Sequence, residues 1–214
     1  MQTPVCFRAM PSGNKFNQAE TDSIPGGDGV GVDPAGTVLA VAGRRIDPVD
    51  PDEPRFPAGN EALVALRIRD RMVSAASKVV VCSGACGADI LALEAAAQLG
   101  LGRRLVLPFA RQQFRATSVA DRGEDWGRRF DAILQQLQSE DIVELNLQIG
   151  SHEAYAATNS EILDQAEGLA SGTGRRALAM VVWNGLNRGA TDLTDQFRRL
   201  AEGRKYEVIQ VSTL

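Results

Sequence analysis

The alternation of short apolar runs with amphipathic segments constrains the fold of this chain more than any other feature. The runs are rich in Val, Leu, Ile and Ala, and most of them contain few polar residues. Continuous apolar strands separated by helices are typical of a parallel sheet with helices on both faces. The predicted strands are 37–43, 78–82, 104–108, 141–145, 177–183 and 206–211, and the predicted helices are 61–76, 88–99, 125–137, 155–169 and 193–202.

The first 36 residues lack this pattern. They contain four prolines and the run Pro-Gly-Gly-Asp-Gly at 25–29, and they sustain no hydrophobic period. We therefore predict a flexible leader or linker over 1–36 and one domain over 37–214. A domain of that length buries a sizeable core without disulfides or metal.

Composition excludes several classes of protein. The net charge of −4 argues against sequence-independent binding of nucleic acid. Three cysteines (Cys6, Cys82 and Cys86) and a single histidine (His152) are too few ligands for a typical zinc site, and an odd cysteine count favours a reducing compartment. Neither a membrane-spanning run nor a signal peptide is visible, so we expect a cytoplasmic protein. We also expect it to bind no metal and no cofactor.

Two strand-to-helix turns are candidate binding loops, because ligands of parallel sheets bind at the carboxyl ends of the strands. The turn Ser83–Asp89 reads Ser-Gly-Ala-Cys-Gly-Ala-Asp, and the turn at 184–191 contains Gly185 and Gly189. Small residues let a ligand approach the backbone, and the N–H groups at a helix start attract an anion. Asp89 either caps its helix or accepts a hydrogen bond from a ribose hydroxyl, and both interpretations stay open.

Arginines near the strand ends suggest a phosphorylated ligand, since guanidinium groups bind phosphate in a bidentate manner. The two turns would form two walls of one pocket. The candidate ligand-binding residues are Gly43, Arg44, Ser83, Gly84, Cys86, Gly87, Ala88, Asp89, Pro108, Phe109, Arg111, Arg115, Asn184, Gly185, Gly189 and Thr191.

Residues 79–95, VVVCSGACGADILALEA, resemble the first glycine motif of the SLOG superfamily, which reads S-G-x-x-x-G-A/V-D before an Ala-rich helix, although this chain has two residues between the glycines instead of three. This superfamily unites Smf/DprA proteins, LOG nucleotide phosphoribohydrolases and nucleotide sensors. Other segments are similar to a bacterial branch found in larger signalling proteins. These segments include 42–47, 55–57, 107–109 and 183–185, with Phe114, Ser118, Val119, Trp126, Arg129, Phe130, Tyr155, Asn159, Gly189 and Thr191, and the resemblance spans residues 38–211.

The resemblance implies a Rossmann-like three-layer α/β/α sandwich, with a mostly parallel sheet of about six or seven strands. It also implies a phosphate cradle of Ser83, Gly84, Gly87 and Ala88, faced by Gly185, Gly189 and Thr191. The hydrolase branch carries P-G-G-x-G-T-x-x-E in its second turn, whereas the second turn of this chain has no P-G-G and has Thr194 in place of the glutamate. Hydrolysis by the usual route of that branch is therefore not expected.

Three functions follow from these observations. The first is binding or sensing of a nucleotide or nucleotide-derived ligand, without catalysis. The second is an enzyme that cleaves or transfers the N-glycosidic bond of a nucleotide, and the third is a non-binding structural module of a larger assembly. The chain could also form a homodimer or be part of a larger signalling assembly, and both alternatives stay open. Binding to a membrane is not expected. The candidate catalytic carboxylates are Asp192, Asp195, Glu153 and Asp89.

Overall fold

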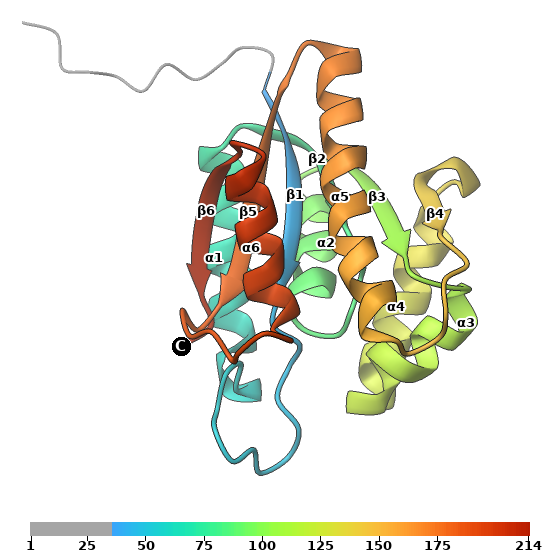
Figure 1. Ribbon diagram of the computed structural model, residues 1–214, viewed down its shortest axis with the longest axis vertical. Coiled ribbons are helices and arrows are strands. Elements are labelled where there is room, and N and C mark those ends of the chain that lie inside the picture. Colours follow the sequence, from blue (N-terminus) through green and yellow to red (C-terminus); the bar gives the residue numbers. More distant parts are fainter. Residues whose placement is uncertain (1–35) are drawn as a thin grey trace, which may run out of the picture. The chain divides into compact units, whose positions relative to one another are not determined.

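The computed structural model describes residues 36–214 of the chain (Figure 1). Its sheet contains six parallel strands in the order β4-β3-β2-β1-β5-β6. The strands are β1 (Thr37–Gly43), β2 (Ser77–Cys82), β3 (Gly102–Leu107), β4 (Ile142–Glu144), β5 (Arg176–Trp183) and β6 (Glu207–Ser212). The predicted α/β class, the parallel sheet and the number of strands are confirmed. The predicted leader lies outside the described residues except for Gly36.

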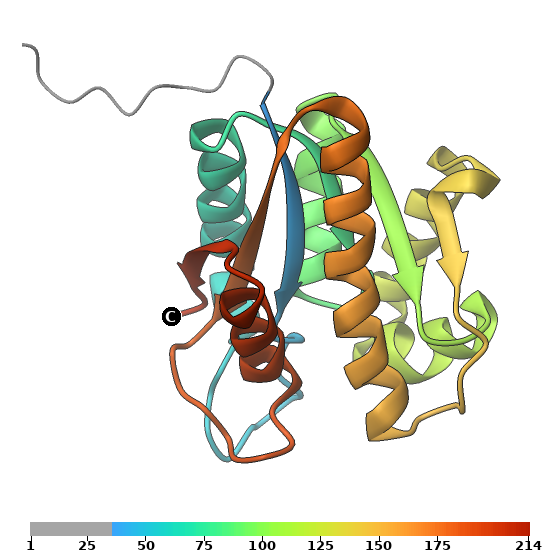
Figure 2. The ribbon, with the colours of Figure 1, turned by 45° about the horizontal axis from the view of Figure 1, so that its top comes forward.

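Helices cover both faces of this sheet, so the three-layer arrangement is also as expected (Figures 1 and 2). Along β1, Leu39 and Val41 point to one layer of helices, while Val38 and Ala40 point to the other. The helices are α1 (Glu61–Ser74), α2 (Ala88–Gln98), α3 (Arg111–Phe114), α4 (Glu124–Gln136), α5 (His152–Thr173) and α6 (Leu193–Gly203). Residues of α1, α2 and α4 pack in the first layer, and those of α5 and α6 pack in the second.

The helical segment after β3 is absent from the sequence-based expectation. It consists of α3, a π-helical turn (Arg115–Val119) and a 3-10 turn (Ala120–Arg122), and it leads into α4. Phe114 and Val119 of this segment are buried in the core. Within residues 36–214, no helix has both the length and the apolar character needed to cross a membrane.

The strand order reverses between β1 and β5. From β1 the chain adds β2, β3 and β4 on one side, and it then returns through α5 to place β5 on the other side. The loops after β1 and β5 therefore run apart, which opens a crevice at the carboxyl ends of these two strands.

Gly87 joins the loop after β1 to the turn before α2. Its φ of +97° is in the region that favours glycine, and a Cβ there would lie 2.5 Å from Ile46 N. The close approach allows Ala88 N–H to donate to Arg44 O at 3.2 Å and Ile46 N–H to donate to Cys86 O at 3.3 Å. The two loops are thereby held together by backbone hydrogen bonds.

We expect Gly87→Ala to lower the free energy of unfolding by about 2 kcal/mol or more, since the added Cβ meets backbone atoms at a positive φ. The matched control is Gly168→Ala, because Gly168 lies within α5 and an added Cβ there would meet no atom within 4 Å. That control should gain about 0.5–1 kcal/mol from helix propensity. Urea denaturation measures both, and equal stability of the two variants would contradict the proposed close approach.

Candidate functional site

A cavity of about 560 Å³ lies at the crevice between the loops that follow β1, β2 and β5, with α5 and the segment after β3 closing its sides. Its size suits a ligand as large as a nucleotide. The polar and charged lining residues are Arg44, Arg45, Asp47, Arg55, Ser83, Asp89, Ser118, Arg122, Tyr155, Thr158, Asn159, Arg188, Thr191, Asp192 and Thr194. The smaller or apolar ones are Ala42, Gly43, Ile46, Pro48, Ala85, Phe114, Ile162 and Leu193.

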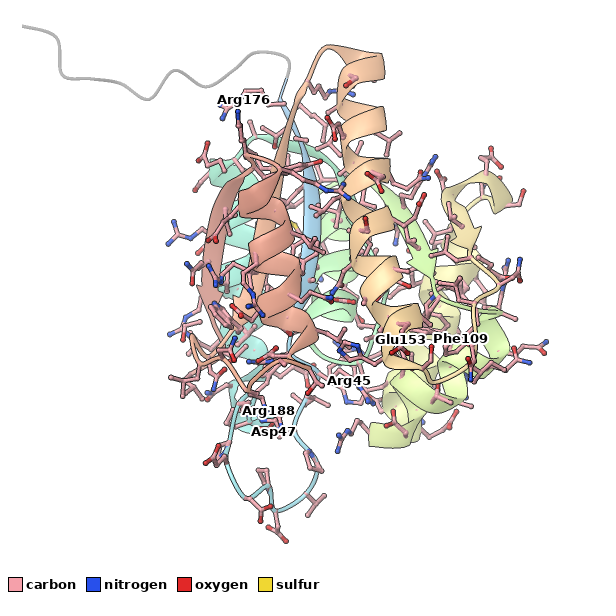
Figure 3. All side chains as sticks on the ribbon, in the orientation of Figure 1. Arg45, Asp47, Phe109, Glu153, Arg176 and Arg188 are labelled. Atoms are coloured by element: carbon pink, nitrogen blue, oxygen red, sulfur yellow. The ribbon has the colours of Figure 1, made fainter. Side chains whose placement is uncertain are left out.

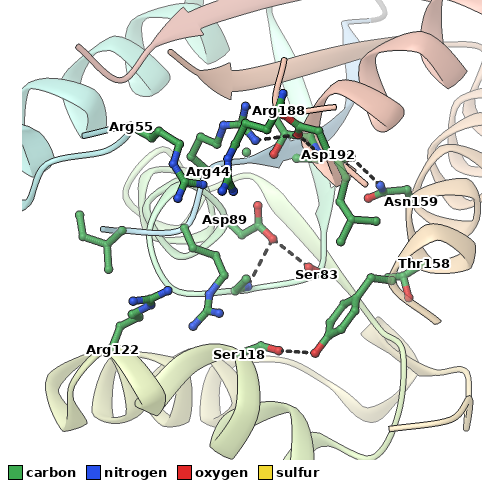
Figure 4. A pocket seen from close by; sticks show the side chains of 18 of the residues that line it. Arg44, Arg55, Ser83, Asp89, Ser118, Arg122, Thr158, Asn159, Arg188 and Asp192 are labelled. Carbon is green, nitrogen blue, oxygen red and sulfur yellow. Dashed lines mark hydrogen bonds and ion pairs between the residues drawn. The ribbon is translucent and has the colours of Figure 1, made fainter. Parts of the chain in front are cut away.

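A buried ion pair connects the two diverging loops at the top of this cavity (Figure 4). Arg44, directly after β1, donates from Nη1 to Asp192 Oδ1 at 2.7 Å and from Nη2 to Asp192 Oδ2 at 2.8 Å. Its Nη2 also donates to Leu186 O at 2.7 Å in the loop after β5. The side chains of Arg44 and Asp192 are 7% and 0% exposed, so this bidentate pair is shielded from water.

Asp192 also caps α6. Its Oδ1 accepts from the backbone N–H groups of Thr194 and Asp195, each at 3.1 Å, and its Oδ2 accepts from Arg188 N–H at 2.9 Å. Burial raises the pKa of Asp192, but the hydrogen bonds from Arg44 and from these amides outweigh it and lower the pKa overall. Both oxygens of Asp192 are therefore occupied, and its carboxylate serves as a brace for the loop rather than as a free reactant.

The glycine turn before α2 encloses a carboxylate of its own. Asp89 Oδ2 accepts hydrogen bonds from Ser83 Oγ at 2.9 Å, Gly84 N–H at 3.1 Å and Ala85 N–H at 3.3 Å. Asp89 is 5% exposed, and its second oxygen, Oδ1, has no hydrogen-bond partner among the described residues. Burial is the main cause that raises the pKa of Asp89 to about 6, and hydrogen bonds from Ser83, Gly84 and Ala85 partly oppose it.

Arginines give the cavity an excess of positive charge, with five arginines against three aspartates in its lining. Arg45 pairs with Asp121 and donates to Cys86 Sγ at 3.2 Å, whereas Arg122 lies 4.0 Å from Asp121. Arg55 and Arg188 have no ion pair within residues 36–214. Burial and the nearby charge of Arg188 lower the pKa of Arg55, so the two guanidinium groups repel each other.

The opposite wall supplies hydroxyl, amide and apolar groups. Ser118 Oγ and Tyr155 Oη share a hydrogen bond of 2.9 Å, which joins the π-helical turn to α5 (Figure 4). Asn159 Nδ2 donates to Leu193 O at 2.9 Å, which joins α5 to the start of α6. Leu193, which is partly exposed in the lining, adds apolar surface to this wall. The cavity thus combines a cationic side with a mixed polar and apolar side.

Part of the predicted site lies in this cavity. Of the predicted ligand-binding residues, the lining contains Gly43, Arg44, Ser83, Asp89 and Thr191. Their role in binding stays a prediction. The predicted residues outside the lining are Gly84, Cys86, Gly87, Ala88, Pro108, Phe109, Arg111, Arg115, Asn184, Gly185 and Gly189.

Two of the predicted phosphate arginines are engaged elsewhere. Arg111 pairs with Glu144 at 2.6 Å, and Arg115 pairs with Asp131 at 2.9 Å and with Glu124. Acidic residues outside the cavity therefore bind both arginines in this structure, and their contact with a ligand stays a prediction. Phe109 and Cys86 are core residues, with 2% and 0% exposure.

The predicted phosphate cradle stays a prediction, but several N–H groups of the turn already have acceptors within the chain. Gly84 N–H and Ala85 N–H donate to Asp89, Cys86 N–H donates to Ser118 O at 3.1 Å, and Ala88 N–H donates to Arg44 O. The carboxylate of Asp89 occupies the position in which the sequence predicted a phosphate.

The four candidate catalytic carboxylates differ in their surroundings. Asp89 and Asp192 line the cavity, and Asp89 alone of these two keeps an oxygen without a partner. Asp195 is outside the lining and binds Arg198 at 2.7 Å and Arg199 at 3.1 Å. Glu153 is exposed in the first turn of α5 and is also outside the lining.

Sequence reasoning did not assign a binding role to several lining residues. Arg55, Ser118, Tyr155 and Asn159 appear in the segments that resemble the SLOG branch, and that was the signal that could have found them. Arg188 follows the strand β5 within a loop that was already a candidate. No sequence pattern distinguished these arginines from those that pair with surface carboxylates.

Comparison with known proteins adds a likeness in fold. No model of a protein family matches the chain, and no curated protein matches it. Among solved structures, it is similar to DNA processing protein A (DprA) from Streptococcus pneumoniae, with a TM-score of 0.41 and 16% sequence identity. The match covers 82% of this chain and 59% of that one, so this chain spans less than two thirds of the length of DprA.

We expect Asp192→Asn to lower the free energy of unfolding by about 3 kcal/mol, because it leaves Arg44 buried without a carboxylate. Glu207→Gln is the control, since Glu207 pairs with Arg176 at the other end of the molecule (Figure 3) and both side chains are more than half exposed. That control should change stability by less than about 0.5 kcal/mol. Similar, small losses in urea denaturation of both variants would show that the Arg44 pair does not brace the loops.

We expect the free energy of unfolding of the wild type to fall relative to that of Asp89→Asn as the pH rises. The folded-state pKa of about 6 is above the unfolded value of 3.8, so the stabilising contribution of protonation is present at low pH and is lost as the pH passes 6. Between pH 4.5 and 7.5 the difference in unfolding free energy should shift by about 2 kcal/mol in favour of the variant. Denaturation at these two pH values measures the shift, and a constant difference would contradict the raised pKa.

Proposed function

We propose that the cavity binds a nucleotide or a nucleotide-derived ligand, with its phosphate groups at Arg55 and Arg188. The observation that carries the proposal is the pair of arginines without ion pairs, among the described residues, at the rim of a cavity located where the strand order reverses. The charge of Arg188 contributes to the lowered pKa of Arg55, and a phosphate bound by both guanidinium groups would offset that effect.

The remaining lining fits the rest of a nucleotide. Leu193 and Tyr155 are partly exposed in the lining, so Leu193 offers an apolar contact to a base and Tyr155 offers a hydroxyl group. A cavity of about 560 Å³ has room for one such ligand. The cationic rim also argues against a positively charged ligand.

Binding without turnover is the favoured form of this function. Asp192 is fully engaged by hydrogen bonds, and Asp195 and Glu153 lie outside the cavity lining. A binding domain of this kind would act as a sensor whose occupancy follows the concentration of the nucleotide.

Cleavage of the N-glycosidic bond is the second candidate, and one observation favours it. Asp89 lines the cavity, its Oδ1 is buried without a partner among the described residues, and its pKa is about 6, which suits a group that stabilises a sugar cation or moves a proton. Incubation with nucleoside monophosphates distinguishes the candidates, because an enzyme would release free base and a sensor would leave the nucleotide intact.

We expect Arg55→Gln and Arg188→Gln each to weaken nucleotide binding by about tenfold, since each removes a charge-assisted contact to phosphate. A matched control is Arg69→Gln, because Arg69 is exposed on α1 and is not part of the cavity lining. Thermal shift against nucleoside monophosphates and the corresponding nucleosides measures the effect. Wild-type protein should bind the monophosphates more tightly than the nucleosides.

Two results would contradict the proposal. The first is the absence of any thermal shift with nucleotides at millimolar concentration, which would favour a structural module instead. The second is an equal loss of binding in Arg69→Gln and in the two rim variants. That result would mean that the net charge of the protein, rather than contact with Arg55 and Arg188, accounts for the effect.

A further inference from the structure

The two oxygens of the Asp89 carboxylate have different surroundings. Its Oδ2 is saturated by the hydroxyl of Ser83 and by two amides of the glycine turn. Its Oδ1 has no partner in the described part of the chain, although the residue is 5% exposed and lines the cavity. Figure 4 shows the carboxylate of Asp89 facing the hollow beneath Arg44, with dashed lines from one of its oxygens to the turn. Oδ1 is itself buried, and a buried acceptor without a partner is costly, so a donor that a ligand brings to this atom would relieve that cost.

Asp89 gives one end of the cavity a negative charge, whereas Arg55 and Arg188 give the other end a positive charge. Because Asp89 fills the anion position of the glycine turn, a phosphate group would meet a negative charge there rather than free N–H groups. The uncompensated positive charge is at Arg55 and Arg188, on the loops that follow β1 and β5. A ligand that satisfies both ends is anionic at one end and carries a hydrogen-bond donor at the other.

We propose that Asp89 Oδ1 accepts a hydrogen bond from a sugar hydroxyl of the bound nucleotide, so that the cavity selects nucleotides with an intact ribose over those that lack the hydroxyl groups of the sugar. This inference rests on the proposed function, and it adds the part of the ligand that the site reads. Ser83, Gly84 and Ala85 are positioning residues in this account, since they fix the orientation of the carboxylate through Oδ2.

A hydroxyl fits this acceptor better than the other donors of a nucleotide. The edge of guanine presents two parallel N–H donors and needs both oxygens of a carboxylate, whereas Oδ2 is already saturated. The amino groups of adenine and cytosine stand beside a ring nitrogen that is itself an acceptor, which would face the carboxylate unfavourably. A cationic donor is disfavoured because five arginines line the same cavity.

The direct test is the affinity of the wild-type protein for two nucleotides with the same base and the same phosphates. One carries ribose and the other is its 2′,3′-dideoxy counterpart. We expect the ribonucleotide to bind at least about tenfold more tightly, because the dideoxy ligand leaves Oδ1 unpaired. Isothermal titration calorimetry measures both affinities.

Asp89→Asn tests the assignment to this atom. The amide oxygen can take the place of Oδ2 and accept from the same three donors, while the NH₂ group replaces the free acceptor by a donor. We expect the preference for ribose to fall to less than about threefold, with the change mainly in the affinity for the ribonucleotide. Thermal unfolding verifies that the variant is folded.

Asp47→Asn is the matched control, because it removes one negative charge from the same cavity. Its Oδ2 accepts from Arg55 N–H at 2.7 Å and Phe56 N–H at 2.8 Å, away from the glycine turn. This variant should shift both affinities together and keep the preference for ribose.

The possible outcomes separate this inference from the function on which it rests. Equal, measurable binding of both nucleotides by the wild type would overturn the assignment of Asp89 to the sugar and leave nucleotide binding intact. A preference for ribose that persists in Asp89→Asn would overturn it as well. Failure of both nucleotides to bind at millimolar concentration would overturn the proposed function together with this inference.

Discussion

The buried ion pair between Arg44 and Asp192 is the interaction on which the rest of the site depends. The sheet is extended on both sides of the neighbouring strands β1 and β5, so the loops that follow these two strands diverge. The pairing of β1 with β5 ends at Gly43 and Val182. The bidentate pair spans that divergence with contacts of 2.7 and 2.8 Å. Because Asp192 also caps α6, the position of this helix and the position of the arginine at the end of β1 are set together.

The charge that the cavity presents to a ligand depends on which of its arginines are already paired with carboxylates of the chain. Asp192 satisfies Arg44, and Asp121 satisfies Arg45, so neither arginine requires a ligand. Arg55, Arg188 and one oxygen of Asp89 remain without such partners among residues 36–214. The unpartnered, buried oxygen of Asp89 carries a cost that a ligand would relieve, and charged or polar groups left without partners are often found at binding sites.

The strands and most helices could be predicted from the sequence because their signals are local. Runs such as 37–43 and 177–183 are apolar throughout and end at polar or glycine residues, which fits strands buried on both faces. The segment 111–122 was missed, since its short α, π and 3-10 turns have no sustained period. It is held instead by tertiary contacts such as the burial of Phe114 and the hydrogen bond from Cys86 N–H to Ser118 O.

The site was less predictable than the fold because it depends on pairings between distant residues. Arg44 and Arg111 look alike in the sequence, yet one is braced inside the cavity by Asp192 and the other is bound outside it by Glu144. The glycine turn was recognised, but its spacing gave no indication that Asp89 would fold back onto Gly84 and occupy the anion position.

Native mass spectrometry of the protein, before and after addition of a mixture of nucleotides, tests the central claim most directly. We expect a species heavier than the chain by the mass of one nucleotide, which is either present on purification or formed on addition. A spectrum that shows the unliganded chain under both conditions would contradict the claim that this cavity is a nucleotide site.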